Sequence, residues 1–354
     1  MPDVFTLLFW ILAVVFAAQF IVGIFLTGNM SNKIDRQAKK ITGVSIIIPF
    51  HTESSRIIPL LESLNRQAFE GKSVEVIFVD DYSDDDTKNV IQNKLKIPFT
   101  QVCLNSKYGK KKALHKGIEK AQFDFILTLD ADVVLPENYM DFLFQLPIAD
   151  LVILPVKMSG KKIIQKLAAV EFGWLQVLTF GAVKPTLCNG ANLLFRKTAY
   201  DAVYSTRTDF DLASGDDVFL LNAFQENNQK ILRVHEEELT VMTPAPQNSR
   251  ELFQQRKRWI GKLSRMGDSR SYFALLFLIV IEAGFIFSLI GVFYNPLLLF
   301  IIAVKMMTEF MLYINTARAD FSKAFVITVI HQVWYPFYMI GLFFPVRKDV
   351  RWDP

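Results

Sequence analysis

Long apolar segments occupy both ends of the chain. Residues 4–26 carry no charged side chain, and residues 272–344 are similarly apolar apart from breaks at 294–296 and 316–323. Because about 20 apolar residues cross the hydrocarbon core of a bilayer, both ends predict membrane-spanning helices. A cleaved signal peptide fits the first segment poorly, since no Lys or Arg precedes it and its apolar run is too long.

Between these ends, short apolar runs alternate with segments of helical periodicity. Strands are predicted at residues 44–50, 74–81, 99–105 and 123–130. Helices are predicted between them, at 54–69, 88–95 and 111–121. This alternation predicts an α/β domain with a doubly wound, mostly parallel sheet. The strands are continuously apolar rather than alternating, which favours a sheet buried on both faces.

The pattern predicts five parts in chain order. They are an N-terminal transmembrane anchor at 1–30, an α/β domain at 40–248, a basic amphipathic interface helix at 249–270, a membrane region of two to three helices at 272–344, and a tail at 345–354. The basic cluster Lys33, Arg36, Lys39 and Lys40 follows the first apolar segment. By the positive-inside rule, we expect an integral protein of the cytoplasmic (inner) membrane whose α/β domain faces the cytoplasm.

Composition and charge narrow the possible partners. The formal net charge is +4, and much of the excess borders the apolar segments, so anionic lipid headgroups explain it better than nucleic acid. The two cysteines, Cys103 and Cys188, show neither metal-ligand spacing nor a disulfide framework, which suits a reducing compartment. We interpret Cys188 as a buried packing residue.

Acidic residues follow two of the predicted strands. Asp80 and Asp81 end one strand, and Asp130 and Asp132 end another. Ligands of such sheets bind outside the carboxyl ends of the strands. Side chains at positions i and i+2 of an extended segment point the same way, so Asp130 and Asp132 predict a site for Mg²⁺ or Mn²⁺ completed by substrate phosphates. No Walker A or GxGxxG sequence occurs, which disfavours P-loop and dinucleotide-binding sites.

Two later segments carry candidate chemistry. Asp216 and Asp217 precede an apolar run, where they indicate either first-turn acids of a helix or a general base for an acceptor hydroxyl. The segment QQRKRW at 254–259 indicates either a membrane-interface helix or a ligand site. In the second interpretation Trp259 stacks on a sugar and Arg258 meets diphosphate oxygens.

Together and in this order, the motifs resemble those of the family-two glycosyltransferases, inverting enzymes with the GT-A fold. The resemblance covers roughly residues 43–262 and extends to the flanking membrane segments of membrane-bound members. The matching segments are IPFHTES, VDDYSDDDT, YGKKKALHKGI, LDADV, NGANLLFR, GDD and QRKRW, the last being similar to the family's QxxRW motif. Thr52 stands where the family usually has Asn.

The resemblance implies a role for each matching residue. Glu53, Asp81, Lys110, Asp130 and Arg258 would bind the nucleotide sugar, with Asp81 at the base or ribose and Lys110 near the diphosphate. Asp130 and Asp132 would hold the metal. Asp217, with its neighbour Asp216, would be the catalytic base. Gln255 and Trp259 would bind the acceptor.

The expected function is therefore a hexosyltransferase-type glycosyltransferase of the membrane. It would move a sugar from a UDP- or GDP-sugar to a lipid or lipid-linked glycan of the cell envelope, by metal-assisted single displacement. Two alternatives stay open: a processive polysaccharide synthase, and a metal-dependent nucleotidyl or phosphoryl transferase. A non-catalytic membrane protein of the same fold is a third interpretation.

The C-terminal apolar region also contains ionisable residues, which are costly in lipid. They are Glu282, Lys305, Glu309 and His331. Lys305 and Glu309 are four residues apart and are placed to share a helix face. We weigh two interpretations equally: a functional role, and pairing between helices.

Overall fold

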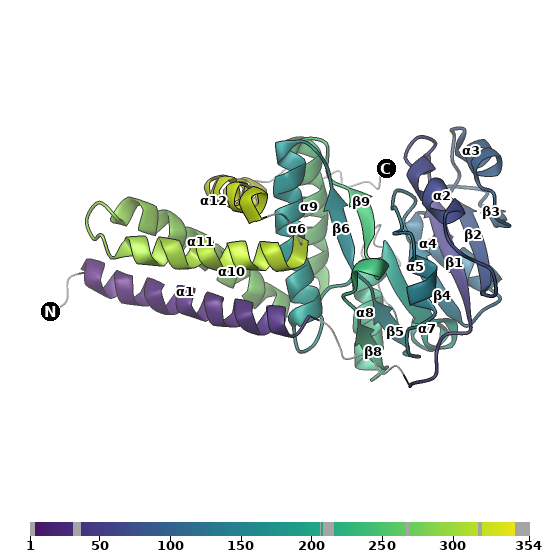
Figure 1. Ribbon diagram of the computed structural model, residues 1–354, viewed down its shortest axis with the longest axis horizontal. Coiled ribbons are helices and arrows are strands. Elements are labelled where there is room, and N and C mark those ends of the chain that lie inside the picture. The colour runs from purple at the N-terminus through teal and green to yellow at the C-terminus, as the bar shows by residue number, and fades with distance from the viewer. Residues whose placement is uncertain are drawn as a thin grey trace. The chain divides into compact units, whose positions relative to one another are not determined.

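The computed structural model describes residues 4–30, 37–205, 207, 216–266, 269–317 and 321–343. They fall into two compact units, each assembled from separate stretches of chain. The helical unit comprises residues 1–29, 160–183 and 245–349, and the α/β unit comprises 30–159, 184–244 and 350–354. Figure 1 labels the elements of both units.

The α/β unit is built on a seven-stranded sheet of order β3-β2-β1-β4-β7-β5-β8. Its strands are β1 (Gly43–Phe50), β2 (Ser73–Asp80), β3 (Thr100–Cys103), β4 (Phe125–Leu129), β5 (Leu151–Ile153), β7 (Asn192–Arg196) and β8 (Ile231–Arg233). All neighbouring pairs are parallel except those that involve β7, which runs antiparallel to β4 and β5. The predicted α/β fold with a mostly parallel sheet is confirmed.

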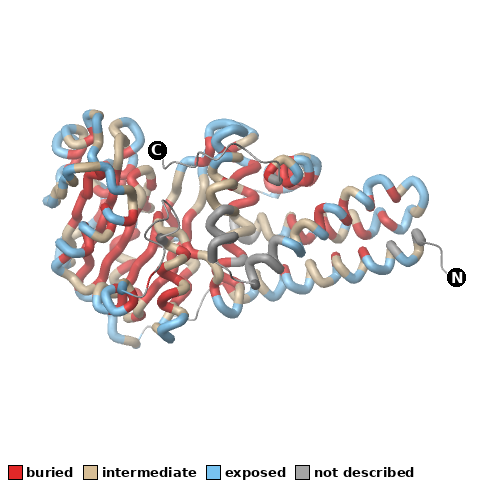
Figure 2. Tube along the Cα trace, turned by 180° about the vertical axis from the view of Figure 1, so that it is seen from behind, coloured by how far each residue is buried: buried red, intermediate tan, exposed pale blue. Residues whose placement is uncertain are grey.

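Helices cover this sheet and bury its strands. They are α2 (Ile58–Asn65), α3 (Thr87–Lys94), α4 (Lys110–Lys120), α5 (Tyr139–Leu143), α7 (Lys197–Tyr204), α8 (Asp216–Glu226) and the 3₁₀ turn η1 (Glu237–Leu239). All eight residues of β1 are buried, and Figure 2 shows the strands of this unit mostly in the colour of buried residues. A second, two-stranded parallel sheet joins β6 (Val156–Ser159) to β9 (Val241–Pro244).

The order of the strands places a ligand crevice. From β1 the chain proceeds through β2 and β3 on one side of the sheet, and then returns to β4 on the other side of β1. The point between β1 and β4 is therefore the topological switch point of the sheet. In open α/β sheets, ligands bind there, outside the carboxyl ends of the strands.

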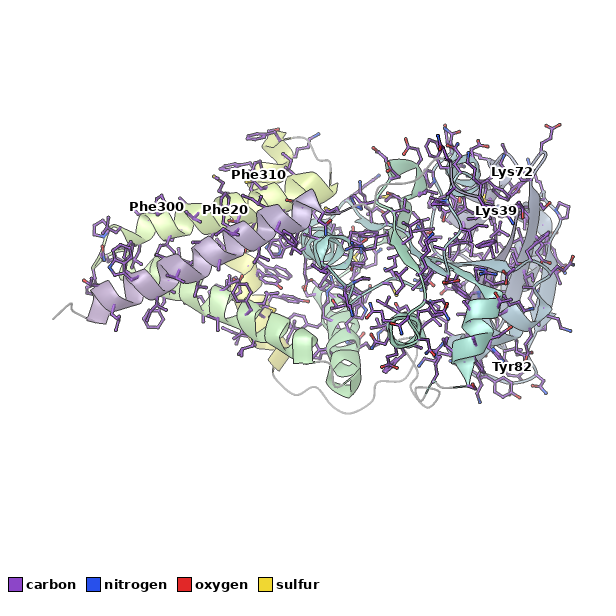
Figure 3. All side chains as sticks on the ribbon, turned by 90° about the horizontal axis from the view of Figure 1, so that it is seen from below. Phe20, Lys39, Lys72, Tyr82, Phe300 and Phe310 are labelled. Atoms are coloured by element: carbon purple, nitrogen blue, oxygen red, sulfur yellow. The ribbon has the colours of Figure 1, made fainter. Side chains whose placement is uncertain are left out.

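The helical unit contains α1 (Val4–Gly28), α6 (Ile163–Gly181), α9 (Ser249–Met266), α10 (Ser269–Gly291), α11 (Leu298–Ala317) and α12 (Phe321–Phe343). Helices α1, α10 and α11 pack against one another, and Figure 1 shows them side by side. In Figure 3 the labelled side chains of Phe20, Phe300 and Phe310 lie along this bundle.

Three helices are long and apolar enough to cross a membrane. They are Phe9–Gly28, Ile163–Gly181 and Phe321–Leu342, with Leu276–Gly291 as a shorter apolar helix. Large apolar side chains on these and neighbouring helices are exposed, for example Trp10 and Phe337 at 61% and 69%. Both ends of the chain thus carry apolar helices, as predicted. The structure adds one such helix, Ile163–Gly181, between the strands of the α/β unit in chain order.

Replacing Gly117 tests the packing of α4 on the sheet. A Cβ at this position would lie 2.5 Å from Ile47 Cγ2 on β1 and 2.9 Å from Val79 Cγ2 on β2, so Gly117→Val forces a shift of rigid side chains. Overpacking of this kind costs about 1–3 kcal/mol. We expect a clear fall in the thermal unfolding midpoint of the purified chain. Lys116→Val, on the exposed side of the same helix, should change the unfolding midpoint by less. Equal midpoints for the two variants would contradict this packing.

Candidate active site

Three carboxylates lie at the switch point of the sheet. Glu53 follows β1, and Asp130 and Asp132 follow β4. Because β1 and β4 are parallel neighbours, these loops meet at one edge. Two cations accompany the acids: Lys110 Nζ donates to Asp130 Oδ1, and Arg56 donates to Asp132 Oδ2 at 2.6 Å. The structure thus brings four predicted residues, Glu53, Lys110, Asp130 and Asp132, to one place.

This site holds more negative charge than its own cations offset. Burial raises the pKa of Glu53 to about 7; Arg56 opposes this shift, and Asp132 and Asp130 add to it. Burial, and then the charge of Asp130, also raises the pKa of Asp132. Glu53 Oε2 is buried and accepts no hydrogen bond within the described residues, and its distance to Arg56 Nε is 3.4 Å. An additional positive charge would relieve this repulsion.

The donor set fits a divalent cation that shares its ligands with a substrate. Asp130 and Asp132 offer carboxylate oxygens, which Mg²⁺ and Mn²⁺ prefer. Within the described part of the chain, no group of three or more His, Cys, Asp or Glu forms a complete metal cage. Two carboxylates suit Mg²⁺ all the same, because this ion is usually bound by one or two carboxylates together with substrate phosphates and water.

Neighbouring acids hold the loop that carries Glu53. Thr52 has a left-handed backbone with φ of 56°, and its hydroxyl donates to Asp84 Oδ1 at 2.9 Å. The backbone N–H groups of Glu53 and Ser54 donate to Thr87 Oγ1 and Asp85 Oδ2, each at 2.9 Å. The acidic run after β2 therefore serves first to fix the loop after β1.

Asp81 is fully buried and has a structural partner on each oxygen. Tyr108 N donates to Oδ1 and Gly109 N donates to Oδ2, both at 2.8 Å. Gly109 has a φ of +90°, which a residue with a side chain rarely adopts, and it caps α4. Asp81 thereby positions the first residue of α4, Lys110. Its predicted contact with the nucleotide stays a prediction.

Asp217 is tied to the same edge of the sheet through the loop before β7. Leu129 of β4 pairs with Asn192 of β7, so the preceding residues lie beside the end of β4. In that loop, Gly190 N donates to Asp217 Oδ2 at 3.3 Å, and Gly190 O accepts a 2.9 Å hydrogen bond from Thr128 Oγ1. Asp217 is half-buried, so its carboxylate is held yet reachable.

Two further predicted features lie around Asp217. Cys188 is buried and its Sγ donates to Asp217 O at 3.1 Å, which agrees with its interpretation as a packing residue. Asp216 begins helix α8, but its side chain lies outside the described part of the structure, as do residues 214 and 215.

The other predicted residues belong to helix α9 of the helical unit. Arg256, which the QxxRW pattern leaves unspecified, organises this motif. Its side chain is 3% exposed. Its Nε donates to Glu171 Oε2 of α6 at 2.8 Å, and its Nη1 donates to Gln255 Oε1 at 2.5 Å. Its guanidinium lies 4.2 Å from the centre of the Trp259 ring. Arg256 thus holds two of the three motif residues, and burial lowers the pKa of the third, Arg258.

Sequence reasoning missed three residues of these clusters. Arg56 follows Glu53 by three positions, a spacing that would have suggested an ion pair. Arg256 and Glu171 are 85 residues apart, so nothing local in the sequence pairs them.

Comparison with known proteins gives matches to two family models. Residues 45–144 match the model of glycosyl transferase family 2, and residues 125–344 match that of glycosyl transferase family group 2. Solved structures are also similar. The mannosyltransferase PcManGT from Pyrobaculum calidifontis, in complex with GDP-Man and Mn²⁺, is 15% identical with a TM-score of 0.49, over 93% of this chain and 99% of that one.

Curated relatives match over shorter stretches. The undecaprenyl-phosphate 4-deoxy-4-formamido-L-arabinose transferase of Pseudomonas syringae pv. syringae (strain B728a) is 34% identical over 107 residues, which are 29% of this chain and 32% of that protein. The poly-beta-1,6-N-acetyl-D-glucosamine synthase of Staphylococcus aureus (strain COL) is 29% identical over 111 residues, 31% of this chain and 26% of that protein. The matches span about a third or less of these relatives.

The Arg256–Glu171 pair predicts a pattern of stabilities. Arg256→Met leaves a buried carboxylate without its cation, which costs about 3–5 kcal/mol. Removing both charges, in Arg256→Met with Glu171→Leu, should recover most of the loss. Thermal unfolding of the purified chain measures both, with the exposed Lys166→Met of α6 as control. A double variant no more stable than Arg256→Met would show that the ion pair is not the source of the loss.

Proposed function

Because this chain belongs to glycosyl transferase family group 2, we propose that it is an inverting glycosyltransferase that moves a sugar from a nucleotide-diphosphate sugar to a lipid or lipid-linked acceptor. The observation that carries the proposal is the meeting of Glu53, Asp130 and Asp132 at the switch point, with Asp217 tied to the same edge. A nucleotide diphosphate is the kind of ligand that such a crevice accepts.

The donor side of the site is charged in a way that suits a diphosphate. Lys110 and Arg56 supply positive charge beside Asp130 and Asp132. A bound Mg²⁺ or Mn²⁺, held by these two Asp residues, would stabilise the charge that develops on the leaving nucleoside diphosphate. Asp81 keeps Lys110 in place through the Tyr108–Gly109 backbone. A UDP- or GDP-sugar is our proposed donor.

Asp217 is the proposed general base. Its carboxylate would take the proton from the acceptor hydroxyl as the oxygen attacks the anomeric carbon. Attack from the face opposite the diphosphate inverts the configuration in one displacement, so no covalent sugar–enzyme intermediate is required. Asp216 is its proposed neighbour at the site. For Gln255, Arg258 and Trp259, the acceptor and diphosphate roles stay predictions from the motif.

A membrane acceptor accords with the helical unit. Three of its helices are long and apolar enough to cross a bilayer, so the chain is suited to act on a substrate that stays in the membrane. The basic residues that follow α1, including Lys39 and Lys40, support a cytoplasmic α/β unit at the inner membrane. A relative named as an undecaprenyl-phosphate transferase supports a lipid-linked acceptor.

Processive polysaccharide synthesis is the second candidate. A match to a poly-beta-1,6-N-acetyl-D-glucosamine synthase favours it. Product length separates the two: single addition gives a lipid with one added sugar, and processive synthesis gives a polymer. A nucleotidyltransferase would release pyrophosphate instead of nucleoside diphosphate.

The first test is Asp217→Asn in the full chain, purified in detergent with its co-purifying lipids. Amide replacement removes the base and keeps the shape, so sugar transfer should fall by about 10²- to 10⁴-fold. The measurement is nucleoside diphosphate release from a panel of UDP- and GDP-sugars, together with sugar incorporation into the lipid fraction. Asp201→Asn, exposed on α7, is the matched control and should keep the wild-type rate. Wild-type transfer by Asp217→Asn would overturn the assignment of the base.

Metal removal gives a second test. Treatment with EDTA should abolish transfer, and Mg²⁺ or Mn²⁺ should restore it, because two carboxylates and a diphosphate share the ion. Asp132→Asn should need a higher metal concentration for half-maximal rate than the wild type. Undiminished transfer after EDTA treatment and desalting would exclude the metal from the reaction.

A further inference from the structure

A cluster of polar side chains lies inside the helical unit and takes no part in the proposed reaction. Its members are Gln19 of α1, Glu282 of α10, Lys305 and Glu309 of α11, and His331 and Gln332 of α12. All except Gln19, which is half-buried, are at most 4% exposed. The sequence left two interpretations of the four ionisable residues open, a functional role and pairing between helices. Three of them, Glu282, Lys305 and Glu309, are paired.

Lys305 lies at the centre of the cluster, in contact with three side-chain oxygens. Its Nζ is 3.1 Å from Glu282 Oε1, 2.7 Å from Glu309 Oε1 and 2.5 Å from Gln332 Oε1. It also lies 4.3 Å from the centre of the Phe285 ring. The ammonium donates a hydrogen bond to Gln332 and forms ion pairs with both carboxylates, so its single charge faces two Glu side chains.

The charges of the cluster do not balance. Two carboxylates face one ammonium, and among the described residues Lys305 is the one cation paired with either Glu. His331 also lies near Lys305, and neither of its ring nitrogens has a hydrogen-bond partner among the described residues. If both carboxyl groups are ionised, one negative charge of the cluster is left in an apolar bundle, where it is costly unless a cation or a proton neutralises it.

Six polar atoms of the cluster lack a partner among the described residues: Gln332 Nε2, the two ring nitrogens of His331, and three oxygens that suit a ligand of positive charge. Glu282 Oε2, Glu309 Oε2 and Gln19 Oε1 are buried and accept no hydrogen bond from the residues that the structure describes. Gln19 of α1 lies near the Glu309 side chain of α11, which places its amide at the cluster. Buried polar atoms in proteins nearly always have a partner, so each such atom indicates a missing ion or water.

We propose that this cluster binds one monovalent metal cation, with Na⁺ as the best match, through Glu282 Oε2, Glu309 Oε2 and Gln19 Oε1. A single positive charge balances the cluster, and hard oxygen ligands suit an alkali cation. A Ca²⁺ ion takes six to eight oxygens and would overcompensate the charge. This site joins α1, α10 and α11, so the cation would stabilise the packing of the helical unit whatever reaction the α/β unit performs.

The test is thermal unfolding of the full chain in detergent at constant pH and ionic strength, with NaCl exchanged for choline chloride. A ligand that binds the folded state raises the midpoint in a saturable manner, so the midpoint should rise with Na⁺ and level off. KCl should act at higher concentration than NaCl. Glu309→Gln removes a charged ligand oxygen and should abolish the dependence on Na⁺, whereas Glu62→Gln, exposed on α2, should keep it.

Equal midpoints in NaCl and choline chloride would overturn the proposal and leave buried water or a proton as the partner of the unused oxygens. An undiminished Na⁺ effect in Glu309→Gln would overturn it as well. Should Glu309→Gln fail to fold, Gln19→Leu serves instead, because it removes a neutral ligand oxygen without changing the charge. It should raise the half-saturating Na⁺ concentration about tenfold, which is the effect of losing roughly 1.4 kcal/mol of binding free energy.

Discussion

Parallel pairing between β1 and β4 brings together the residues of the proposed active site. The two strands end at the same edge, so the residues that follow them must share a small volume at the switch point. Glu53, Asp130 and Asp132 stand there. Burial, and then repulsion between these carboxylates, raises the pKa of Glu53 and of Asp132. Arg56 and Lys110 offset part of this charge. The negative charge that they leave uncompensated favours a cation, which would bind together with an anionic substrate.

Carboxylates serve two different purposes in the α/β unit. Asp81 and Asp217 accept hydrogen bonds from backbone N–H groups and so hold the loops before α4 and before β7. Asp130 and Asp132 instead face other charged side chains. The first group builds the edge of the sheet, and the second group gives it its charge. Asp217 is half-buried, so as the proposed base it is held by its surroundings and can still reach a substrate.

Buried charge also organises the helical unit. The Arg256–Glu171 pair joins α9 to α6 and holds Gln255 and Trp259, and the Lys305 cluster joins α10, α11 and α12. Burying ions is costly, so these pairs contribute less to stability than apolar contacts of the same size would. Separating either pair would leave a buried charge without its partner, which disfavours packing arrangements that pull the paired helices apart.

The sequence by itself determined the kind of elements, their order and the family. Apolar runs and helical periodicity predicted β1, β2 and β4 and the helices between them. The ordered motifs selected Glu53, Asp130 and Asp132 as candidate site residues, and the structure brings these three to one edge. Tertiary structure alone decided that β7 runs antiparallel, because an apolar run carries no direction. It also decided that Asp81 is buried under Tyr108 and Gly109, and that Arg56 meets Asp132 across 76 residues. Such contacts depend on strand register and helix packing, which bring together side chains that no local pattern relates.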